Sequence, residues 1–231
     1  MSIYALIPAA GRGSRLSAEV PKQYLPLAGR PMLWHAARAV CVPSVESVFV
    51  VLAPDDRAFA ALDWSAFAGK LEPLYCGGET RRDSVYNGLV AAMTVVEASD
   101  WMLVHDAARP CLPRKDLDTL VRETQNDEVG GILGLPIADT VKRAAKDESG
   151  AQRVAATENR SLLWLAQTPQ MFRAGLLLQA LKRARGAPTD EAAAVEQMGL
   201  KPRLIAGSRE NLKVTWLEDI AIAESILKRR A

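Results

Sequence analysis

Short apolar segments alternate with amphipathic segments along most of the chain. The apolar runs predict strands at Ile3–Ala9, Ser47–Ala53, Leu71–Cys76, Trp101–His105, Gly131–Leu135 and Arg203–Ala206. The runs between them carry apolar residues at helical spacing, over Pro31–Val40, Ser84–Met93, Asp116–Thr124 and Arg173–Arg185. This alternation predicts an α/β fold in which helices cover both faces of a mostly parallel, Rossmann-like sheet.

The last helix has a start signal of its own. Thr215 precedes Glu218 by three residues, which is the spacing of a capping box, and a helical apolar pattern follows over Ile220–Leu227. The sequence therefore predicts a helix that begins just after Thr215.

One polar segment, from about Asp139 to Arg160, interrupts the alternation. Ser149-Gly150 lies near its middle, and short β-compatible runs around Val141 and Val154 lie on either side. A protruding β-hairpin, or β-arm, fits this pattern; a disordered surface loop is the alternative. We expect a single domain over residues 1–231, with the arm at about 139–160.

Composition narrows the class of protein. A net charge of +2 gives no support for nucleic-acid binding, and no apolar run reaches the ~18 residues that a membrane span needs. The three cysteines, Cys41, Cys76 and Cys111, are odd in number and widely spaced, which favours a reducing compartment. We expect a cytoplasmic protein that binds neither nucleic acid nor membrane.

The first strand runs directly into a glycine-rich loop, Ala9-Ala10-Gly11-Arg12-Gly13-Ser14-Arg15. Backbone N–H groups in such a loop can approach an anion closely. A GxGxxG fingerprint is absent because Leu16 stands where the third glycine would be, and no Gly-Lys-Ser/Thr of a Walker loop follows. Arg15 and Lys22 add the fixed positive charge that phosphate chemistry needs. A plain tight turn is the alternative, but strand ends are where ligands gather in α/β sheets.

Two further motifs follow predicted strands. Thr80 and Asp83 in the Gly77–Gly88 motif have capping-box spacing, so the motif is either a simple strand–helix junction or a place where Gly78 and Ser84 meet a nucleobase. Asp106, at the end of an apolar strand, needs a partner if it is buried. Mg²⁺ shared with a phosphate is favoured over a simple ion pair with Arg109.

Lys213 stands alone in Asn211-Leu212-Lys213-Val214-Thr215. A lone lysine is usually a solvated surface charge. Its place between hydrogen-bonding residues, ahead of the predicted last helix, favours a functional site.

Taken together, these motifs resemble the 2-C-methyl-D-erythritol 4-phosphate cytidylyltransferase family of the non-mevalonate isoprenoid pathway. Seven motifs occur in order along nearly the whole chain: AAGRGSR with PKQY, GGETRRDSVYNG, VHDAARP, DTVKR, ENRSLLWLAQTPQMF, TDEAAAVE and NLKVT. The resemblance implies a fold of the nucleotide-diphospho-sugar transferase type with a β-arm.

The resemblance also implies roles for individual residues. The matched residues that bind CTP are Ala9, Ala10, Gly11, Gly78, Ser84 and Ala107. The matched catalytic residues are Arg15, Lys22, Arg160 and Lys213, and Asp106 matches the Mg²⁺ ligand. The matched substrate-binding residues, mostly contacts to the substrate phosphate, are Arg109, Thr140, Arg160, Thr168, Thr189 and Lys213. Thr140 and Arg160 belong to an arm that reaches the partner's site in the family, so the resemblance implies a homodimer with exchanged arms.

The implied reaction joins CTP to 2-C-methyl-D-erythritol 4-phosphate and releases pyrophosphate. A phosphate dianion is already a nucleophile and needs no general base, in agreement with the lack of a Ser–His or Cys–His pairing. Three alternatives remain: a cytidylyltransferase for another polyol phosphate such as ribitol 5-phosphate, a nucleotidyltransferase that uses UTP or GTP, and a nucleotide-binding regulator without catalysis. Retention of all four charges Arg15, Lys22, Asp106 and Lys213 argues against the regulator.

Overall fold

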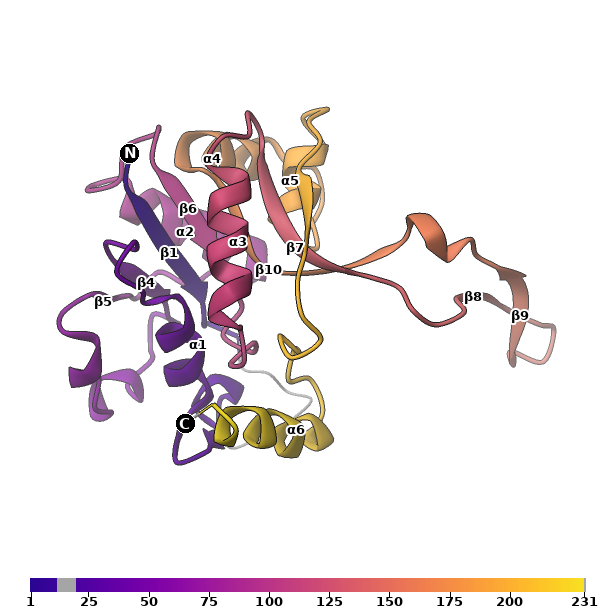
Figure 1. Cartoon of the computed structure of the whole chain (residues 1–231), viewed down its shortest axis with the longest axis horizontal. Coiled ribbons are helices and arrows are strands. Elements are labelled where there is room, and N and C mark those ends of the chain that lie inside the picture. Colours follow the sequence, from indigo (N-terminus) through magenta and orange to yellow (C-terminus); the bar gives the residue numbers. More distant parts are fainter. Residues whose placement is uncertain (12–19, 231) are drawn as a thin grey trace.

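A mixed, mostly parallel sheet forms the centre of the molecule. The computed structural model describes residues 1–11 and 20–230, and within them the sheet has the order β11-β7-β10-β6-β1-β4-β5 (Figure 1). Its strands are β1 (Ile3–Pro8), β4 (Val48–Val51), β5 (Leu71–Leu74), β6 (Trp101–Val104), β7 (Gly130–Pro136), β10 (Trp164–Arg173) and β11 (Arg203–Ala206). Neighbours run parallel except β10, which is antiparallel to both β6 and β7. The predicted fold class is confirmed.

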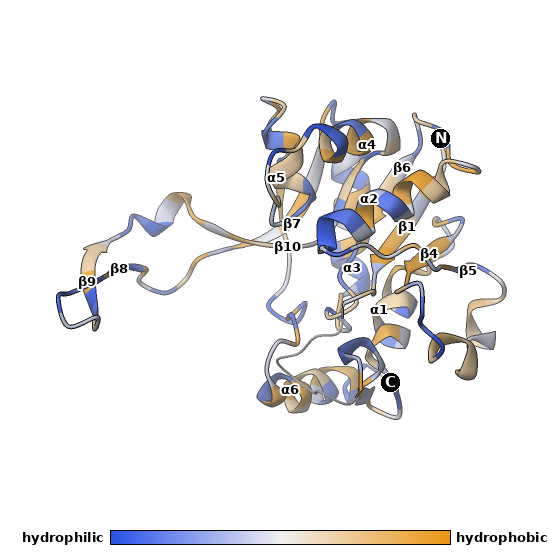
Figure 2. Ribbon diagram, turned by 180° about the vertical axis from the view of Figure 1, so that it is seen from behind, coloured by the Kyte–Doolittle hydropathy of each residue, from blue (hydrophilic) through white to orange (hydrophobic). Residues whose placement is uncertain are grey.

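Helices cover both faces of this sheet. Leu33 of α1 (Met32–Val40) and Leu117 of α3 (Arg114–Thr124) belong to the apolar core on one face. Val85 of α2 (Arg81–Ala92) and Leu177 of α4 (Ala174–Arg183) belong to the core on the other, beside α5 (Glu191–Glu196). Figure 2 shows the apolar residues concentrated along β1, β4 and β6, as expected for strands buried on both faces.

A smaller apolar cluster lies below the carboxyl ends of the strands. Here α6 (Leu217–Lys228) packs Ala223 and Ile226 against Leu27 and Met32, next to the two-residue strands β2 (Pro26–Leu27) and β3 (Arg30–Pro31). This packing fixes the segment before α6, which carries Lys213.

The segment expected to form an arm is a hairpin. Strands β8 (Lys142–Lys146) and β9 (Gln152–Thr157) pair in antiparallel fashion and project from the body, with every residue exposed (Figure 1). The Asp147 carboxylate accepts hydrogen bonds from the backbone N–H of Ser149 and Ala151, at 2.9 and 3.0 Å, and so closes the turn. The β-arm prediction is confirmed, and the alternative of a disordered loop is wrong.

The run Gln167-Thr168-Pro169-Gln170 lies inside β10, where the register shifts between Ala166 and Gln170. One expectation needs correction. The last helix begins at Leu217, and its capping carboxylate is Asp219, not Glu218: Asp219 accepts from the N–H of Thr215 at 2.7 Å and of Trp216 at 2.9 Å. In the described part of the chain, no helix is long and apolar enough to cross a membrane.

Candidate active site

A cavity of about 170 Å³ opens at the carboxyl ends of β1 and β6. Parallel strands end together at this edge, so segments far apart in the sequence meet there. The cavity is lined by Pro8, Ala9, Gly11, Lys22, Gln23, Met32, Arg81, Asp106, Ala107, Ala108 and Lys213. Of the predicted residues, it therefore collects part of the glycine-rich loop, Lys22, Asp106, Ala107 and Lys213. Arg15 lies outside the described residues.

Three cations surround the Asp106 carboxylate. Arg81 donates from Nε to Oδ1 at 3.0 Å, and its terminal nitrogen lies 2.9 Å from the same oxygen. Lys213 Nζ lies 2.8 Å from Oδ2, and Arg109 Nε lies 3.9 Å from it. Burial alone would raise the pKa of the Asp106 carboxyl, but Arg81, then Lys213 and Arg109, outweigh burial and hold the pKa well below its usual range. Asp106 is therefore ionised, and the pocket keeps an excess of positive charge.

Arg81 also ties this carboxylate to a second one. Its two terminal nitrogens donate to Glu191 at 2.6 and 3.1 Å, in a bidentate arrangement. Glu191 is only 1% exposed and starts α5, whereas Arg81 starts α2. Burial opposes the charge on Arg81, but Glu191 and Asp106 outweigh it and raise the pKa of the guanidinium further.

A buried polar network holds the backbone around Asp106. The Asp106 N–H donates to Thr168 Oγ1 at 2.9 Å, and that hydroxyl lies 3.2 Å from His105 Nδ1. His105 Nε2 lies 3.0 Å from the Arg109 carbonyl oxygen. Burial lowers the pKa of the His105 imidazole to about 4, so the ring is neutral near pH 7.

Arg109 and Asn211 complete this network. One Arg109 nitrogen donates to the Asn211 carbonyl at 2.6 Å and another to the Ala166 carbonyl at 3.3 Å. The Asn211 amide donates to the Thr168 carbonyl at 2.8 Å. Arg109, at 8% exposure, thus joins the strand ends to the segment that carries Lys213.

The loops after β1 and β5 approach each other closely. A Cβ built on Gly77 would lie 2.2 Å from the Ala10 Cβ, and one on Gly78 would lie 2.5 Å from the Asp83 Cβ. Glycine is therefore needed at both positions. The Gly78 N–H donates to Ser84 Oγ at 3.1 Å, and the same hydroxyl donates to the Thr80 carbonyl at 3.0 Å. The expected cap is present, because Thr80 Oγ1 accepts from the Asp83 N–H at 3.1 Å.

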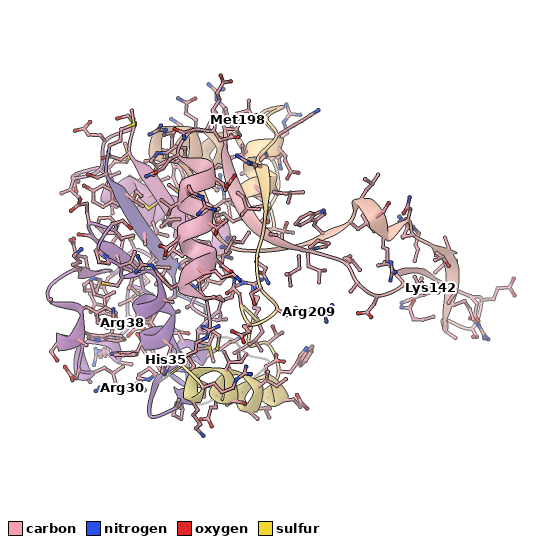
Figure 3. The ribbon with its side chains drawn as sticks, in the orientation of Figure 1. Arg30, His35, Arg38, Lys142, Met198 and Arg209 are labelled. Carbon is pink, nitrogen blue, oxygen red and sulfur yellow. The ribbon has the colours of Figure 1, made fainter. Side chains whose placement is uncertain are left out.

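The remaining predicted residues lie farther out. Thr189 is exposed just before α5. Thr140 and Arg160 belong to the exposed arm, where Arg160 donates to the Ala138 carbonyl. The loop that carries Arg209 lies beside the base of the arm (Figure 3). A second cavity, of about 390 Å³, is lined by residues of both, and Lys213 lines both cavities. Within one described chain, the arm residues are not brought to the Asp106 cavity.

Sequence reasoning missed Arg81, Glu191 and His105. A signal existed for Arg81: two arginines open α2, although a helix N-terminus disfavours cations. Such a placement indicates that a nearby carboxylate compensates the charge. For His105, the only signal was a histidine directly after a fully apolar strand.

A model of the 2-C-methyl-D-erythritol 4-phosphate cytidylyltransferase family matches residues 3–229. Relatives of that name from Dechloromonas aromatica (strain RCB) and Azoarcus sp. (strain BH72) are 55% and 52% identical over 228 residues, which cover 98% of this chain and 98% and 94% of theirs. A crystal structure described as 4-diphosphocytidyl-2C-methyl-D-erythritol synthase superposes with a TM-score of 0.83 at 40% identity, covering 98% of this chain and 99% of that one. The Francisella tularensis 2-C-methyl-D-erythritol 4-phosphate cytidylyltransferase gives 0.79 at 31%, covering 98% and 100%.

Proposed function

The chain belongs to the 2-C-methyl-D-erythritol 4-phosphate cytidylyltransferase family, and on that premise we propose how its site performs cytidylyl transfer. The family expected from the seven sequence motifs is confirmed, and the protein is a cytidylyltransferase. It joins CTP to 2-C-methyl-D-erythritol 4-phosphate, giving 4-diphosphocytidyl-2-C-methyl-D-erythritol and pyrophosphate in isoprenoid precursor biosynthesis.

The observation that supports this reaction at this site is the cationic cavity around Asp106. Lys22, Arg81 and Lys213 line a space at the strand ends, beside the glycine-rich loop. A triphosphate needs both features, since backbone N–H groups hold its oxygens and fixed cations neutralise charge that grows during transfer.

The chemistry follows from positioning and charge. A phosphate oxygen of the substrate attacks the α-phosphorus of CTP in line, the bond to the bridging oxygen breaks, and pyrophosphate leaves with that electron pair. Lys22, Arg15 and Lys213 are the residues we assign to the developing charge. The nucleotide base is assigned to the loops around Ala10 and Gly78, where close approach leaves no room for side chains.

A divalent cation fits this site only if it arrives with the nucleotide. Within the described residues, no group of three or more His, Cys, Asp or Glu side chains could hold a metal. Asp106 alone would hold it, with phosphate oxygens as further ligands, which is the usual pattern for Mg²⁺. When bound, Mg²⁺ would neutralise charge on the triphosphate.

We expect that the enzyme requires a divalent cation for activity. Activity should vanish in excess chelator and return with Mg²⁺, and Asp106→Asn should raise the Mg²⁺ concentration needed for half-maximal rate. Full activity in excess chelator contradicts the assignment of Asp106 as the metal ligand.

We also propose a cytoplasmic homodimer in which the arms are exchanged. Support comes from the arm itself: Val154 and Leu162 are 66% and 83% exposed, and β8 and β9 bury no core of their own. Exposed apolar side chains on a projecting segment are typical of a surface that contacts another chain, and a second copy of this chain would cover them. The free cysteines agree with a reducing compartment.

Product analysis tests the substrate assignment. The protein is incubated with CTP, Mg²⁺ and either 2-C-methyl-D-erythritol 4-phosphate or ribitol 5-phosphate, and pyrophosphate release is followed for each. We expect turnover with the methylerythritol substrate and little with ribitol 5-phosphate. Preference for ribitol 5-phosphate, or equal turnover with UTP, contradicts the assignment.

A further inference from the structure

Lys22 is the first residue of a one-turn 3₁₀ helix, η1 (Lys22–Tyr24). The turn is closed by the Tyr24 N–H, which donates to the Pro21 carbonyl at 2.8 Å. A 3₁₀ helix has three residues per turn, so successive side chains point about 120° apart. Lys22, Gln23 and Tyr24 therefore leave the backbone on three different sides, and each side meets a different part of the molecule.

Tyr24 anchors η1 to the body of the protein. Its ring belongs to the same apolar core as Leu33 of α1. Its hydroxyl donates to Asp56 Oδ2 at 2.8 Å, and the other oxygen of that carboxylate accepts from the Phe59 N–H at 3.1 Å. The core side of η1 is thus fixed by packing and by one hydrogen bond.

Gln23 anchors the second side of η1 to the end of β1. Its Nε2 donates to the Ala9 carbonyl at 2.7 Å, and the residue is 6% exposed. A carbonyl oxygen only accepts, so the nitrogen end of the amide must face Ala9. Ala9 begins the glycine-rich loop, and its own N–H donates to the Val51 carbonyl of β4 at 2.8 Å. The Gln23 amide therefore ties η1 to a backbone position that the sheet holds independently.

The third side of η1 carries Lys22, which lines the cavity at the strand ends together with Gln23. A lysine ammonium sits on a flexible four-carbon stem, so the region it can reach depends on where its backbone is held. Without the Gln23 amide, η1 keeps only the Tyr24 anchor and can turn about it, away from the glycine-rich loop. Misplacing a group that acts on a transition state by about 1 Å can cost ~10²-fold in rate.

We propose that Gln23 is a positioning residue that holds Lys22 against the glycine-rich loop, and that it acts through Lys22 rather than by binding the nucleotide itself. This role rests on the proposed function, in which Lys22 stabilises the charge that develops during cytidylyl transfer.

Steady-state kinetics test this role. Gln23→Met keeps the length of the side chain but cannot donate to the Ala9 carbonyl. We expect kcat to fall ~10–100-fold, because the Lys22 ammonium no longer lies where charge develops, while the KM for CTP stays near the wild-type value. An unchanged kcat overturns the proposal. So does a raised KM for CTP with kcat intact, because Gln23 would then contact the nucleotide directly.

A double-variant cycle identifies the residue through which Gln23 acts. Lys22→Ala removes the ammonium, and the placement of an absent group no longer matters. The double variant Lys22→Ala/Gln23→Met should therefore be hardly slower than Lys22→Ala alone. A further loss as large as that of Gln23→Met in the wild-type background contradicts the proposal, because a general structural effect acts independently of Lys22.

Gln197→Met is the matched control for loss of a glutamine amide. Gln197 directly follows α5, and its side chain also bonds to backbone: Oε1 accepts from the Arg185 N–H at 2.8 Å and Nε2 donates to the Arg185 carbonyl at 3.3 Å. It lines neither of the two cavities described above. Its kcat should stay at the wild-type value, and equal losses in Gln23→Met and Gln197→Met contradict a role specific to Gln23.

Hydrogen exchange followed by NMR tests the hydrogen bond in the wild-type protein without any assay. The side-chain amide protons of Gln23 should exchange slowly, because they are buried and bonded, whereas those of the exposed Gln152 in the arm should exchange fast. Fast exchange at Gln23 overturns the proposal. A wild-type protein without cytidylyl transfer overturns the proposed function while the protection at Gln23 remains. An active wild type with an equally active Gln23→Met overturns the role of Gln23 alone.

Discussion

Lys22 lines the cavity to which we assign the triphosphate, where negative charge would grow during transfer. An interaction that strengthens as this charge develops raises kcat, whereas one of constant strength only tightens binding. Loss of one such preorganised charge typically costs ~10²–10³ in turnover, or roughly 3–4 kcal/mol of barrier. We predict that Lys22→Ala lowers kcat by that factor, while its melting temperature stays near the wild-type value.

Lys22→Arg is the matched control. The positive charge survives, but a planar guanidinium cannot occupy the position of a compact ammonium, so rescue should be partial. Kinetics in both substrates decide the matter. If Lys22→Ala raises only the KM for CTP and leaves kcat unchanged, Lys22 binds the nucleotide and does not stabilise the transition state.

Asp116, in the first turn of α3, gives the stability a defined pH dependence. It is 3% exposed, and one of its oxygens is buried without a partner in the described structure. Burial raises its pKa, against smaller opposing effects of the Ser208 backbone, Lys115 and Arg230, while Glu210 adds to the rise. The folded chain thus binds this proton more tightly than the unfolded one, whose pKa is ~3.9. The stability gained is present below that pH and is lost as pH rises through the folded pKa.

Asp116→Asn should remove this loss, because an amide has no proton to release and keeps an acceptor oxygen. We predict that the free energy of unfolding of the variant, minus that of the wild type, rises between about pH 4 and pH 7. Urea unfolding at a series of pH values measures it. A difference that stays flat or falls over this range rules out a buried, proton-binding Asp116 carboxyl.

Single residues could be predicted where chemistry follows a recognisable element. Asp106 comes two residues after an apolar strand, and Lys22 follows the glycine-rich loop, so the pattern alone predicted that both lie at one edge of the sheet. The pairing of Arg81 could not be found in this way, because its partner Glu191 lies 110 residues away. A buried ion pair between the first residues of two helices depends on the tertiary structure, and no local sequence pattern predicts it.

That pair joins two elements, α2 and α5, across the site. Removing Arg81 leaves the 1% exposed Glu191 carboxylate without its bidentate partner, whereas neutralising Glu191 leaves Arg81 bound to Asp106. We predict that Arg81→Met lowers the free energy of unfolding by ~3–5 kcal/mol and that Glu191→Gln lowers it by clearly less.

Arg114→Met is the control for this comparison, since Arg114 also opens a helix but pairs with Asp118 at the surface, where both side chains are about half exposed. Its effect should stay within ~1 kcal/mol. Denaturant unfolding of the three variants gives the order. Equal losses for Arg81→Met and Arg114→Met contradict a structural role for the buried pair.

Strand β10 shows why some elements escape prediction. Its central residues Gln167, Thr168 and Gln170 are polar yet at most 5% exposed, and the register shift breaks the two-residue period. Apolar alternation is the main sequence signal for a strand. It fails here because these polar side chains are buried where they accept hydrogen bonds from the Asp106 N–H, the Asn211 amide and the backbone of α5.

At the level of the whole molecule, the arm could be predicted from the sequence, but its role cannot be derived from a single chain. The polar, charged composition predicted that this segment buries no core, and Ser149-Gly150 between two β-compatible runs favoured a hairpin over a disordered loop. Its place in the assembly depends on a second copy. In one chain, Thr140 and Arg160 stand away from the cavity that Asp106 and Lys213 share.

If arms are exchanged, Arg160 serves the partner's cavity while Lys213 serves its own. Arg160→Ala and Lys213→Ala should each be nearly inactive as pure proteins. Unfolding and refolding an equal mixture makes hybrid dimers about half of the total, each with one site that holds an intact Lys213 and receives an intact arm. We predict recovery of about a quarter of the wild-type activity, from simple pairing statistics in a two-fold dimer. Mixing without exchange is the control and should recover nothing. If Arg160 serves its own chain, no hybrid site is complete, and the refolded mixture stays inactive although it is dimeric.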